Sequence, residues 1–368
     1  MGEAREPTGN RNAREATLPN ATTAFYACIM PTLRDVGEIE AIRLLHQAVL
    51  GRADVVVGPG DDAAVLRCDA SVDLVATTDA LVEGRHYLPA WLGPGARGAR
   101  LAAVNLSDLA AMAARPRWAL LSIGARPEHE MDALVEFQRG LETALAKEGA
   151  TIAGGNLVAV DGEEWWSLTL LGSVARGRAW TRAGARPGDL LALTGHPGRA
   201  AAGLALARRA GDPDAVDPKW RPLLEAWLEP RARTAFAQAL APAEAVTAAI
   251  DVSDGLAADL AHLCDASGMG CDLDAWSLPE DPLLGRAAGT LGLAVTPLRL
   301  GPSDDYELLL AVDPRSRDAA ERAARESGTP LAFLGRFTGR RGELALVAVD
   351  GARTPLDPRG FDHFAGAR

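Results

Sequence analysis

The sequence predicts two consecutive α+β domains. Strand-like runs and helical patterns are interleaved in both halves of the chain, and a turn-rich stretch at residues 183–189 separates the halves. A chain of 368 residues is also long enough to form two hydrophobic cores. We therefore expect an N-terminal domain at 31–182 and a C-terminal domain at 183–368. Residues 1–30 are polar and aperiodic, and we expect a disordered extension or a mis-assigned start, with Met30 as the initiator.

In the first domain, apolar residues at helical spacing predict three helices, at 37–49, 100–114 and 131–147. Short apolar runs bounded by turn residues predict the strands of this domain, at 54–57, 63–66, 74–77, 118–123, 151–153 and 166–174.

The second domain begins with an apolar strand and a glycine-rich turn. The same patterns then predict helices at 199–209, 222–227, 232–240, 256–264 and 317–326. They predict strands at 190–194, 247–250, 308–312 and, as a terminal pair, 331–337 and 343–349.

Charge and lysine content exclude several function classes. The formal net charge is −11, which argues against binding to nucleic acid or to an anionic membrane surface, because both need a cationic face. Only two lysines are present, Lys147 and Lys219, and neither follows a glycine, so the chain lacks a P-loop. Phosphate chemistry in this protein would depend on metal ions, arginines and backbone amides.

The four cysteines show neither C-x-x-C spacing nor the density of a secreted disulfide scaffold. No uninterrupted apolar run approaches membrane-spanning length, and the polar N-terminus lacks the apolar core of a secretory signal. We expect reduced thiols and a cytoplasmic location.

Four acidic clusters flanked by glycine or small residues are the most informative feature. They lie at 60–62, 77–79, 251–255 and 303–306. If folding brings them together, their repulsion must raise their pKa values or be neutralised by cations, and such hard oxygen ligands suit Mg²⁺ or Ca²⁺. Each cluster alone also fits a simpler interpretation. Asp61 and Asp62 fit a surface turn, and Ser253 or Asp254 fits a helix cap.

Two further residues extend this set. Asp108 lies in an alanine- and leucine-rich helix with apolar neighbours four residues away on either side, where a buried carboxylate needs a partner or a metal. His86 follows the 77–79 cluster and is interpreted either as a contact to substrate or as a polar packing residue, because no second histidine pairs with it to suggest zinc.

Five internal motifs and a C-terminal one resemble the thiamine-monophosphate kinase family, within the superfamily that includes aminoimidazole ribonucleotide synthetase. They are Gly-Asp-Asp-Ala-Ala at 60–64, Thr-Thr-Asp-x-Leu-Val-Glu-Gly at 77–84, Asn-Leu-Ser-Asp-Leu-Ala-Ala-Met at 105–112, Asp-x-Ser-Asp-Gly-Leu at 251–256, Asp-Tyr-Glu-Leu-Leu at 305–309 and Gly-Phe-Asp-His-Phe at 360–364. The resemblance runs in order from about residue 36 to residue 364.

The resemblance implies a two-domain fold of the aminoimidazole ribonucleotide synthetase type and a homodimer whose N-terminal sheets pair into a barrel. It implies ATP-dependent phosphorylation of thiamine monophosphate to thiamine diphosphate with Mg²⁺ between the domains. By position, the metal ligands are Asp62, Thr77, Thr78, Asp79, Asp108, Asn156, Asp251 and Asp254. The nucleotide contacts are Gly155, Arg182 and Ser253, and the substrate-side residues are His86, Asp304 and Phe361. Direct in-line transfer is expected, with no covalent or general-base catalytic residue.

Two positions depart from the family pattern. Gly-Gly-Asp-Thr appears here as Gly-Gly-Asn-Leu, so Asn156 supplies an amide oxygen without charge. The usual Gly-Gly-Glu is replaced by a segment ending in Asp304, whose side chain is one methylene shorter. These changes leave two alternatives open. One is another ATP-using member of the superfamily, and the other is a weakened paralogue that senses nucleotide or thiamine phosphates.

Overall fold

Two β-sheets, one in each predicted domain, organise the chain. The structure is a computed structural model that describes residues 31–36, 44–45, 47, 52–57, 65–66 and 68–361. Asp61, Asp62 and most of the predicted helix at 37–49 lie outside the described residues. All described residues belong to one unit of the chain, Pro31–Arg368.

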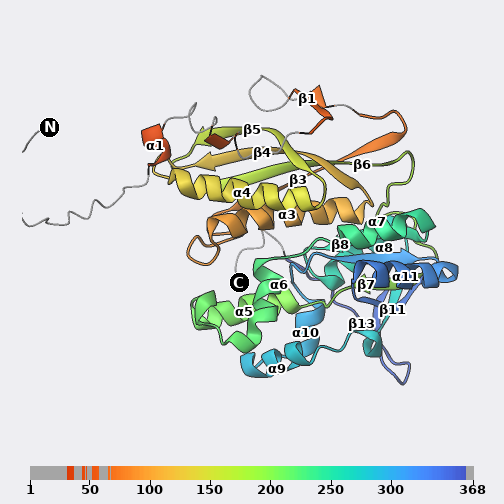
Figure 1. Ribbon diagram of the computed structural model, residues 1–368. Helices are drawn as coiled ribbons and strands as arrows, with labels where there is room; N and C mark the ends of the chain where they lie inside the picture. The colour runs from red at the N-terminus through yellow and green to blue at the C-terminus, as the bar shows by residue number, and fades with distance from the viewer. Residues whose placement is uncertain are drawn as a thin grey trace, which may run out of the picture. The chain divides into compact units, whose positions relative to one another are not determined.

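The N-terminal sheet has four strands in the order β3-β6-β4-β5. They are β3 (Val72–Val82), β4 (Arg115–Ala125), β5 (Thr151–Ala159) and β6 (Trp165–Ala175). The central strand β6 pairs antiparallel with β3 and β4, whereas β4 and β5 run parallel. Two helices, α3 (Pro94–Ala111) and α4 (Met131–Lys147), lie against one face of this sheet (Figure 1). Helix α4 has the predicted bounds, while α3 starts six residues before the predicted position.

The core of this domain fills the space between the sheet and the two helices. Leu101, Leu109, Phe137 and Trp166 are buried in it. The helices pack closely because Gly98 has no side chain, and a Cβ there would lie 2.1 Å from a backbone oxygen of α4. Smaller elements complete the domain: α1 (Leu33–Val36) and the antiparallel pair β1 (Val55–Val57) and β2 (Val65–Leu66).

The C-terminal sheet has seven strands in the order β13-β12-β9-β11-β7-β10-β8. Alternate residues of its central strands face two different cores. In β10, Leu309 packs with Leu256 and Leu260 of α8 on one face, and Leu310 packs with Phe236 of α7 on the other. Both faces are therefore covered by helices, which explains why these strands are continuous apolar runs rather than alternating ones. The strands are β7 (Leu190–Thr194), β8 (Val246–Val252), β9 (Gly270–Asp274), β10 (Glu307–Val312), β11 (Leu331–Thr338), β12 (Leu344–Val347) and β13 (Arg353–Pro355).

The helices of this domain include five that the sequence predicted, α5 (Arg199–Ala210), α6 (Arg221–Leu228), α7 (Thr234–Leu240), α8 (Leu256–Ser267) and α11 (Arg317–Ser327). Sequence patterns missed β9, β13, α9 (Pro282–Leu291) and α10 (Val295–Leu300). The interpretation of 331–337 and 343–349 as a pair was wrong, because β9 lies between β11 and β12 and pairs with both.

The end of α3 joins the two domains. Ala110, Ala111 and Ala113 pack into the core formed by α7, α11 and one face of the C-terminal sheet. Ala113 adopts a positive φ of 55°, which ends the helix and turns the chain into β4. The side chains of α3 therefore contact both domains, and a site on this helix lies at their junction.

The N-terminal sheet is open, and no closed barrel is present among the described residues. The barrel that we expected pairs the sheets of two copies, and a single chain does not test it. Leu74, Leu120 and Val158 are 52%, 37% and 39% exposed, and the strand registers place Leu74 and Leu120 on the sheet face away from α3 and α4.

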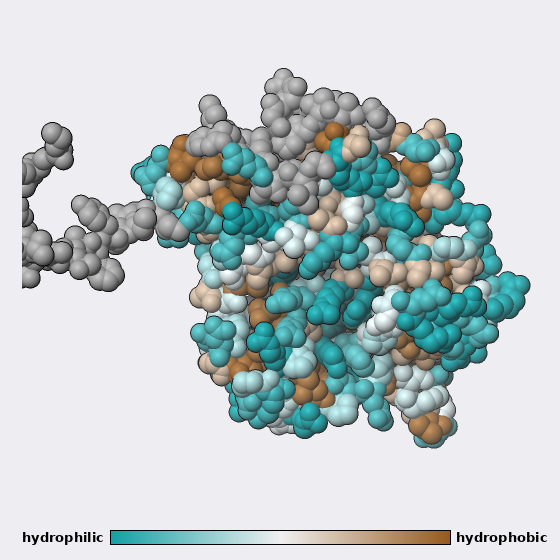
Figure 2. Space-filling model, viewed as in Figure 1, coloured by the Kyte–Doolittle hydropathy of each residue, from teal (hydrophilic) through white to brown (hydrophobic). Residues whose placement is uncertain are grey.

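The surface of the described residues is mixed in polarity (Figure 2), and their cysteines are free thiols. On the face shown in Figure 2, hydrophobic residues form small separate patches among hydrophilic ones. No helix in the described part of the chain is long and apolar enough to cross a membrane. The three described cysteines, Cys68, Cys264 and Cys271, are free thiols.

Candidate active site

Strand β3 presents its two threonines to opposite sides of the sheet. Thr77 donates its hydroxyl proton to Oδ2 of Asp108 on α3, at 2.5 Å. Thr78 is the next residue and points to the other face, where Thr169 donates a hydrogen bond to its hydroxyl oxygen at 3.3 Å. The backbone N–H of Asp79 is held by Oδ1 of Asn105, at 3.1 Å. The alternation of the strand thus brings Thr77 and Asp79, but not Thr78, towards α3.

Asp79 and Asp108 share one half-buried environment. Burial raises the pKa of Asp79, and the charge of Asp108 adds to this effect, so that the pKa lies at about 7. Burial also raises the pKa of Asp108, while the hydroxyl of Thr77 and the nearby charge of Arg182 lower it. Arg182 is thus the predicted nucleotide contact that the structure brings near these carboxylates.

Asp251 completes this group from the other domain. It lies at the end of β8, is 4% exposed, and accepts a hydrogen bond from Ser107 of α3 at 2.7 Å. Burial raises the pKa of Asp251 to about 8, and the charge of Asp108 contributes to the rise. We call Asp79, Asp108 and Asp251 the acidic cluster. Residues more than 140 positions apart in the sequence meet here because α3 contacts both sheets.

The loop that follows Asp251 is held by Asp259, which sequence analysis did not single out. One carboxylate oxygen of Asp259 accepts the backbone N–H groups of Ser253, Asp254 and Gly255 at 3.0 to 3.1 Å. The capping interpretation was wrong, because the N-cap of α8 is Gly255 and no side chain of Ser253 or Asp254 caps the helix. An acidic residue in the first turn of α8 was the signal that could have identified Asp259.

Two of the predicted substrate-side residues, His86 and Asp304, lie around Arg100, a second residue that sequence analysis missed. Arg100 of α3 is 5% exposed, forms an ion pair with Asp304 and donates a hydrogen bond to the carbonyl oxygen of Trp227 in α6. Arg100 also lines a small pocket together with His86, Trp91 and Trp227. Asp304 and His86 therefore lie at the same junction, linked by Arg100.

Tyr306 is half-buried and interacts electrostatically with charged residues of both this junction and the acidic cluster. It adopts a positive φ of 52°, and its N–H donates a hydrogen bond to the carbonyl oxygen of Val252 at 2.8 Å. Burial raises the pKa of the Tyr306 hydroxyl well above its usual range, and its neighbours include the charges of Arg100, Asp304, Asp79 and Asp251. A bulky residue in this backbone region stores strain, which is typical of functional sites.

Two acidic residues of the 303–307 segment have structural partners. Asp305 is buried and accepts the backbone N–H groups of Gly198 and Ala200 at the start of α5, at 2.6 and 3.0 Å. Glu307 forms an ion pair with Arg233 and accepts the hydroxyl proton of Thr194 at 2.6 Å. Of the acidic residues in this segment, Asp304 is the one that pairs with Arg100 at the domain junction.

Phe361 lies beside the 253–255 loop. Its backbone N–H donates a hydrogen bond to the carbonyl oxygen of Asp254, at 3.0 Å, and its side chain is 55% exposed. The preceding Gly360 packs against the same loop, where a Cβ would lie 2.5 Å from the Cβ of Ala258. The predicted substrate-side Phe361 and metal ligand Asp254 are therefore neighbours.

Asn156 lies apart from the acidic cluster. The strand registers align Asn156 with Ser122, Ser167 and Ala80, so it occupies the face of the sheet opposite to Asp79. Three strand spacings separate β5 from β3, roughly 14 Å. Gly155 has a packing role, because a Cβ there would lie 2.1 Å from the carbonyl oxygen of Leu121. A single chain does not bring Asn156 or Gly155 to the other predicted ligands.

The donor set of the acidic cluster fits Mg²⁺. Its carboxylates and the hydroxyl of Thr77 are hard oxygen donors. Within the described ranges, no three acidic, histidine or cysteine side chains form a ready-made metal site. Mg²⁺ usually takes one or two carboxylates and completes its shell with water and substrate phosphates, so an incomplete protein shell agrees with this ion.

Comparison with known proteins identifies relatives over both domains. Residues 60–174 match the family described as AIR synthase related protein, N-terminal domain, and residues 186–347 match the family of its C-terminal domain. The chain is 36% identical over 331 residues to thiamine-monophosphate kinase of Salmonella typhimurium, covering 89% of this chain and 98% of that protein. The crystal structure of thiamine-monophosphate kinase from Stenotrophomonas maltophilia K279a is 32% identical, with a TM-score of 0.73 over 86% of this chain and 96% of that chain. AaThiL complexed with AMPPCP and TMP is 27% identical, with a TM-score of 0.69 over 91% of this chain and 100% of that chain.

Proposed function

Because the chain belongs to the thiamine-monophosphate kinase family, we propose that it phosphorylates thiamine monophosphate with ATP, giving thiamine diphosphate and ADP. The relative AaThiL binds AMPPCP, an analogue of ATP, together with TMP. The two-domain fold is shared with that relative.

The acidic cluster is the observation that carries the proposal. Carboxylates from both domains lie close enough that the charge of Asp108 raises the pKa values of Asp79 and Asp251, and a nucleotide bound there would contact both domains. Such a group needs cations, and phosphoryl transfer needs cations to hold and neutralise phosphates. Asp79, Asp108 and Asp251 would hold Mg²⁺, with further ligands from Thr77 and Asp254. When bound, Mg²⁺ would neutralise charge on the transferred phosphoryl group and hold the phosphates in place.

The transfer is direct and in line. The acceptor oxygen belongs to a phosphate that is already an anion, so no side chain has to remove a proton from it. The residues of this chain bind and orient the two substrates and exclude water. Asp259 holds the 253–255 loop, and Arg182 supplies a positive charge near Asp108 for the nucleotide. A protein that becomes phosphorylated during turnover would contradict this step.

The thiamine side of the site lies at His86 and Asp304. Nδ1 of His86 accepts the backbone N–H of Val82 at 3.0 Å, so the neutral ring carries its proton on Nε2 and can donate there. Asp304 is held by Arg100, whose guanidinium also fixes α6 against α3. Phe361 contributes an apolar ring beside the Asp254 loop.

A homodimer is part of the proposal. The open face of the N-terminal sheet exposes large apolar side chains, Leu74 on β3 and Leu120 on β4, which lie on either side of β6. Apolar rows of this kind favour sheet-on-sheet packing, which would close the barrel between two copies. Size-exclusion chromatography with light scattering measures the mass of the protein in solution. Leu120→Asp is expected to convert a dimer into a monomer.

Product formation tests the function. Purified protein is incubated with ATP, Mg²⁺ and thiamine monophosphate, and thiamine diphosphate and ADP are separated by chromatography. We expect the two products in equal amounts, none of the diphosphate without Mg²⁺, and none from Asp251→Asn. ADP formation that does not depend on thiamine monophosphate would point to another ATP-using member of the superfamily. Nucleotide binding without any product would favour a sensor.

A further inference from the structure

His86 is carried by a turn whose backbone is fixed at both ends. The N–H of Gly84 bonds to the carbonyl oxygen of Tyr87 at 2.9 Å, and the N–H of His86 bonds to that of Val82 at 2.9 Å. The N–H of Glu83 bonds to the carbonyl oxygen of Glu164 in the segment before β6, also at 2.9 Å. These bonds set the path of the chain, and side chains on both flanks of His86 hold it against the domain.

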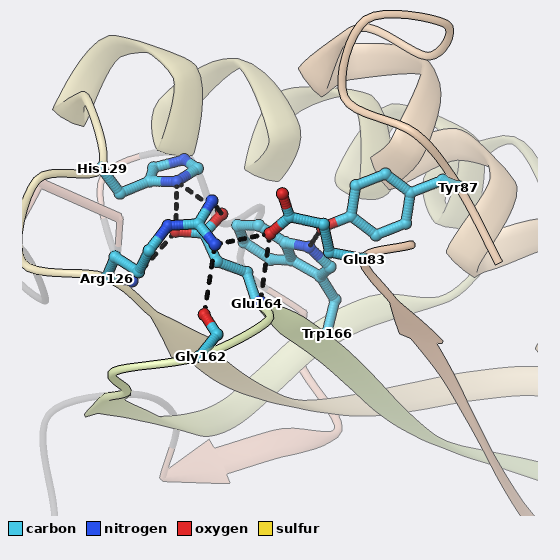
Figure 3. Close-up of polar contacts among 7 residues, drawn as sticks. All are labelled: Glu83, Tyr87, Arg126, His129, Gly162, Glu164 and Trp166. Atoms are coloured by element: carbon cyan, nitrogen blue, oxygen red, sulfur yellow. Dashed lines mark hydrogen bonds and ion pairs between the residues drawn. The ribbon is translucent and has the colours of Figure 1, made fainter. Parts of the chain in front are cut away.

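The Glu83 flank is held by charged groups. Oε2 of Glu83 accepts a hydrogen bond from Nη1 of Arg126 at 2.7 Å and another from the N–H of Glu164 at 3.2 Å. The same Nη1 donates to the carbonyl oxygen of Gly162 at 3.1 Å. Figure 3 shows Arg126 between the carboxylates of Glu83 and Glu164. The ends of β3 and β4 and the start of β6 are thereby joined through one guanidinium.

Glu164 is the buried centre of this group and is 2% exposed. Its carboxylate accepts the backbone N–H of Arg126 at 2.9 Å and contacts Nδ1 of His129 with both oxygens at 2.9 Å. Burial acts to raise the pKa of Glu164, but the contacts with His129 and Arg126 outweigh burial and hold the pKa below its ordinary value. Nε2 of His129 is buried and has no hydrogen-bond partner among the described residues.

The Tyr87 flank is held by aromatic contacts. Nε1 of Trp166 donates a hydrogen bond to the hydroxyl oxygen of Tyr87 at 2.9 Å. The guanidinium of Arg97 lies 5.1 Å from the centre of the Tyr87 ring and 5.6 Å from that of Trp166. The His129 and Trp166 rings are also in contact, with centroids 5.6 Å apart, so both flanks belong to one continuous set of contacts (Figure 3).

We propose that Glu83, Arg126, His129 and Glu164 form a positioning cluster that sets the orientation of His86 towards the thiamine substrate. Buried ion pairs often add less stability than apolar residues of the same volume would, so their value here lies in geometry rather than in stability. The planar guanidinium of Arg126 forms hydrogen bonds in fixed directions in addition to carrying a charge. It connects the turn to two strands of the sheet. The identity of the substrate in this inference rests on the proposed function. The contacts that orient His86 do not depend on the proposed function.

Glu164→Gln is the test variant because it keeps the shape of the side chain and removes its charge. Glu142→Gln is the matched control. Glu142 lies on α4 in the same domain, is 3% exposed, and accepts hydrogen bonds from the hydroxyl of Thr151 and the N–H of Ile152. Both variants lose one buried carboxylate, so a general loss of stability affects them alike. Arg126→Lys keeps the charge but not the planar guanidinium, and serves if Glu164→Gln does not fold.

Two readouts separate positioning from stability. The KM for thiamine monophosphate is expected to rise on the order of tenfold in Glu164→Gln and Arg126→Lys, with the KM for ATP unchanged. The ¹⁵N resonances of the His86 ring are expected to shift in both variants, without substrate, and to stay in place in Glu142→Gln. The resonances of His86 are assigned by their absence from the spectrum of His86→Asn.

The outcomes distinguish the two proposals. A wild-type protein that forms no thiamine diphosphate refutes the proposed function, while the His86 resonances still test the positioning cluster. Unchanged His86 resonances in Glu164→Gln overturn the inference. So does an equal rise of KM in Glu164→Gln and Glu142→Gln, because that pattern would mean only a general loosening of the domain.

Discussion

Replacing Asp251 with asparagine is expected to stabilise the metal-free protein and to abolish phosphoryl transfer. Asparagine has the shape of aspartate and keeps an oxygen that can accept the hydrogen bond from Ser107. It removes a negative charge that burial and Asp108 make unfavourable. An aspartate that binds a cation but lowers the stability of the metal-free protein should show both effects when it is replaced by asparagine.

The magnitude follows from the pKa of Asp251, which rises from 3.8 to about 8. The folded protein keeps this proton up to about pH 8, whereas the unfolded chain releases it near 3.8. Raising the pH between these values therefore lowers the free energy of unfolding of the wild type. At about 1.4 kcal/mol for each pH unit, the full effect is roughly 6 kcal/mol, and sharing of charge with Asp108 reduces it. We expect Asp251→Asn to be about 2 to 5 kcal/mol more stable at pH 8.

Urea unfolding in EDTA at pH 5 to 9 measures this difference. The advantage of Asp251→Asn should grow with pH up to about pH 8 and then level off. Mg²⁺ should stabilise the wild type more than the variant. Asp189→Asn is the control, since Asp189 is a buried aspartate that accepts bonds from Arg186 and Thr247, and its loss should destabilise by about 1 kcal/mol. A variant no more stable than the wild type at pH 8 would refute the account of an uncompensated buried charge.

Three other substitutions test separate parts of the structure. Arg233→Met leaves the buried carboxylate of Glu307 without its ion-pair partner and should lower the free energy of unfolding by about 3 to 5 kcal/mol, most of which Glu307→Gln should restore in the double variant. Gly98→Ala places a Cβ 2.1 Å from a backbone oxygen of α4 and should cost about 2 kcal/mol or more in denaturant unfolding, whereas Gly285→Ala, with open space around it in α9, should be neutral or stabilising. Asn156→Asp should change turnover by less than about threefold, because Asn156 lies three strands from the acidic cluster in one chain; a rise of tenfold or more would favour the weakened paralogue.

Local patterns predicted much of the secondary structure. The bounds of α4 and β7 agree with the predictions because each has a strong apolar pattern and clear end signals. β9 was missed because only five residues, Gly-Cys-Asp-Leu-Asp, form it, and its polar positions resemble a loop. Its place between β11 and β12 depends on pairing across long stretches of chain, which no local pattern contains.

The residues of the candidate site were also predicted only in part from the sequence. Thr77, Asp79, Asp108 and Asp251 were expected together, and they meet at α3. Asp62 lies outside the described residues, so its predicted role stays a prediction. The other site assignments also remain predictions, although Arg182 lies near Asp108 and Asp304 near His86.

The sequence by itself determined the types of donor that this protein has: dense carboxylates, few lysines and no P-loop. Together they predict that phosphate chemistry here depends on metal ions, arginines and backbone amides. Only the tertiary structure decided which carboxylates share a site and which stabilise the fold. Asp304 and Asp305 are adjacent, yet one pairs with Arg100 at the domain junction and the other holds the start of α5. The physical reason is that the pKa and the role of a carboxylate depend on burial and on partners far away in the chain, and only folding brings those partners into contact.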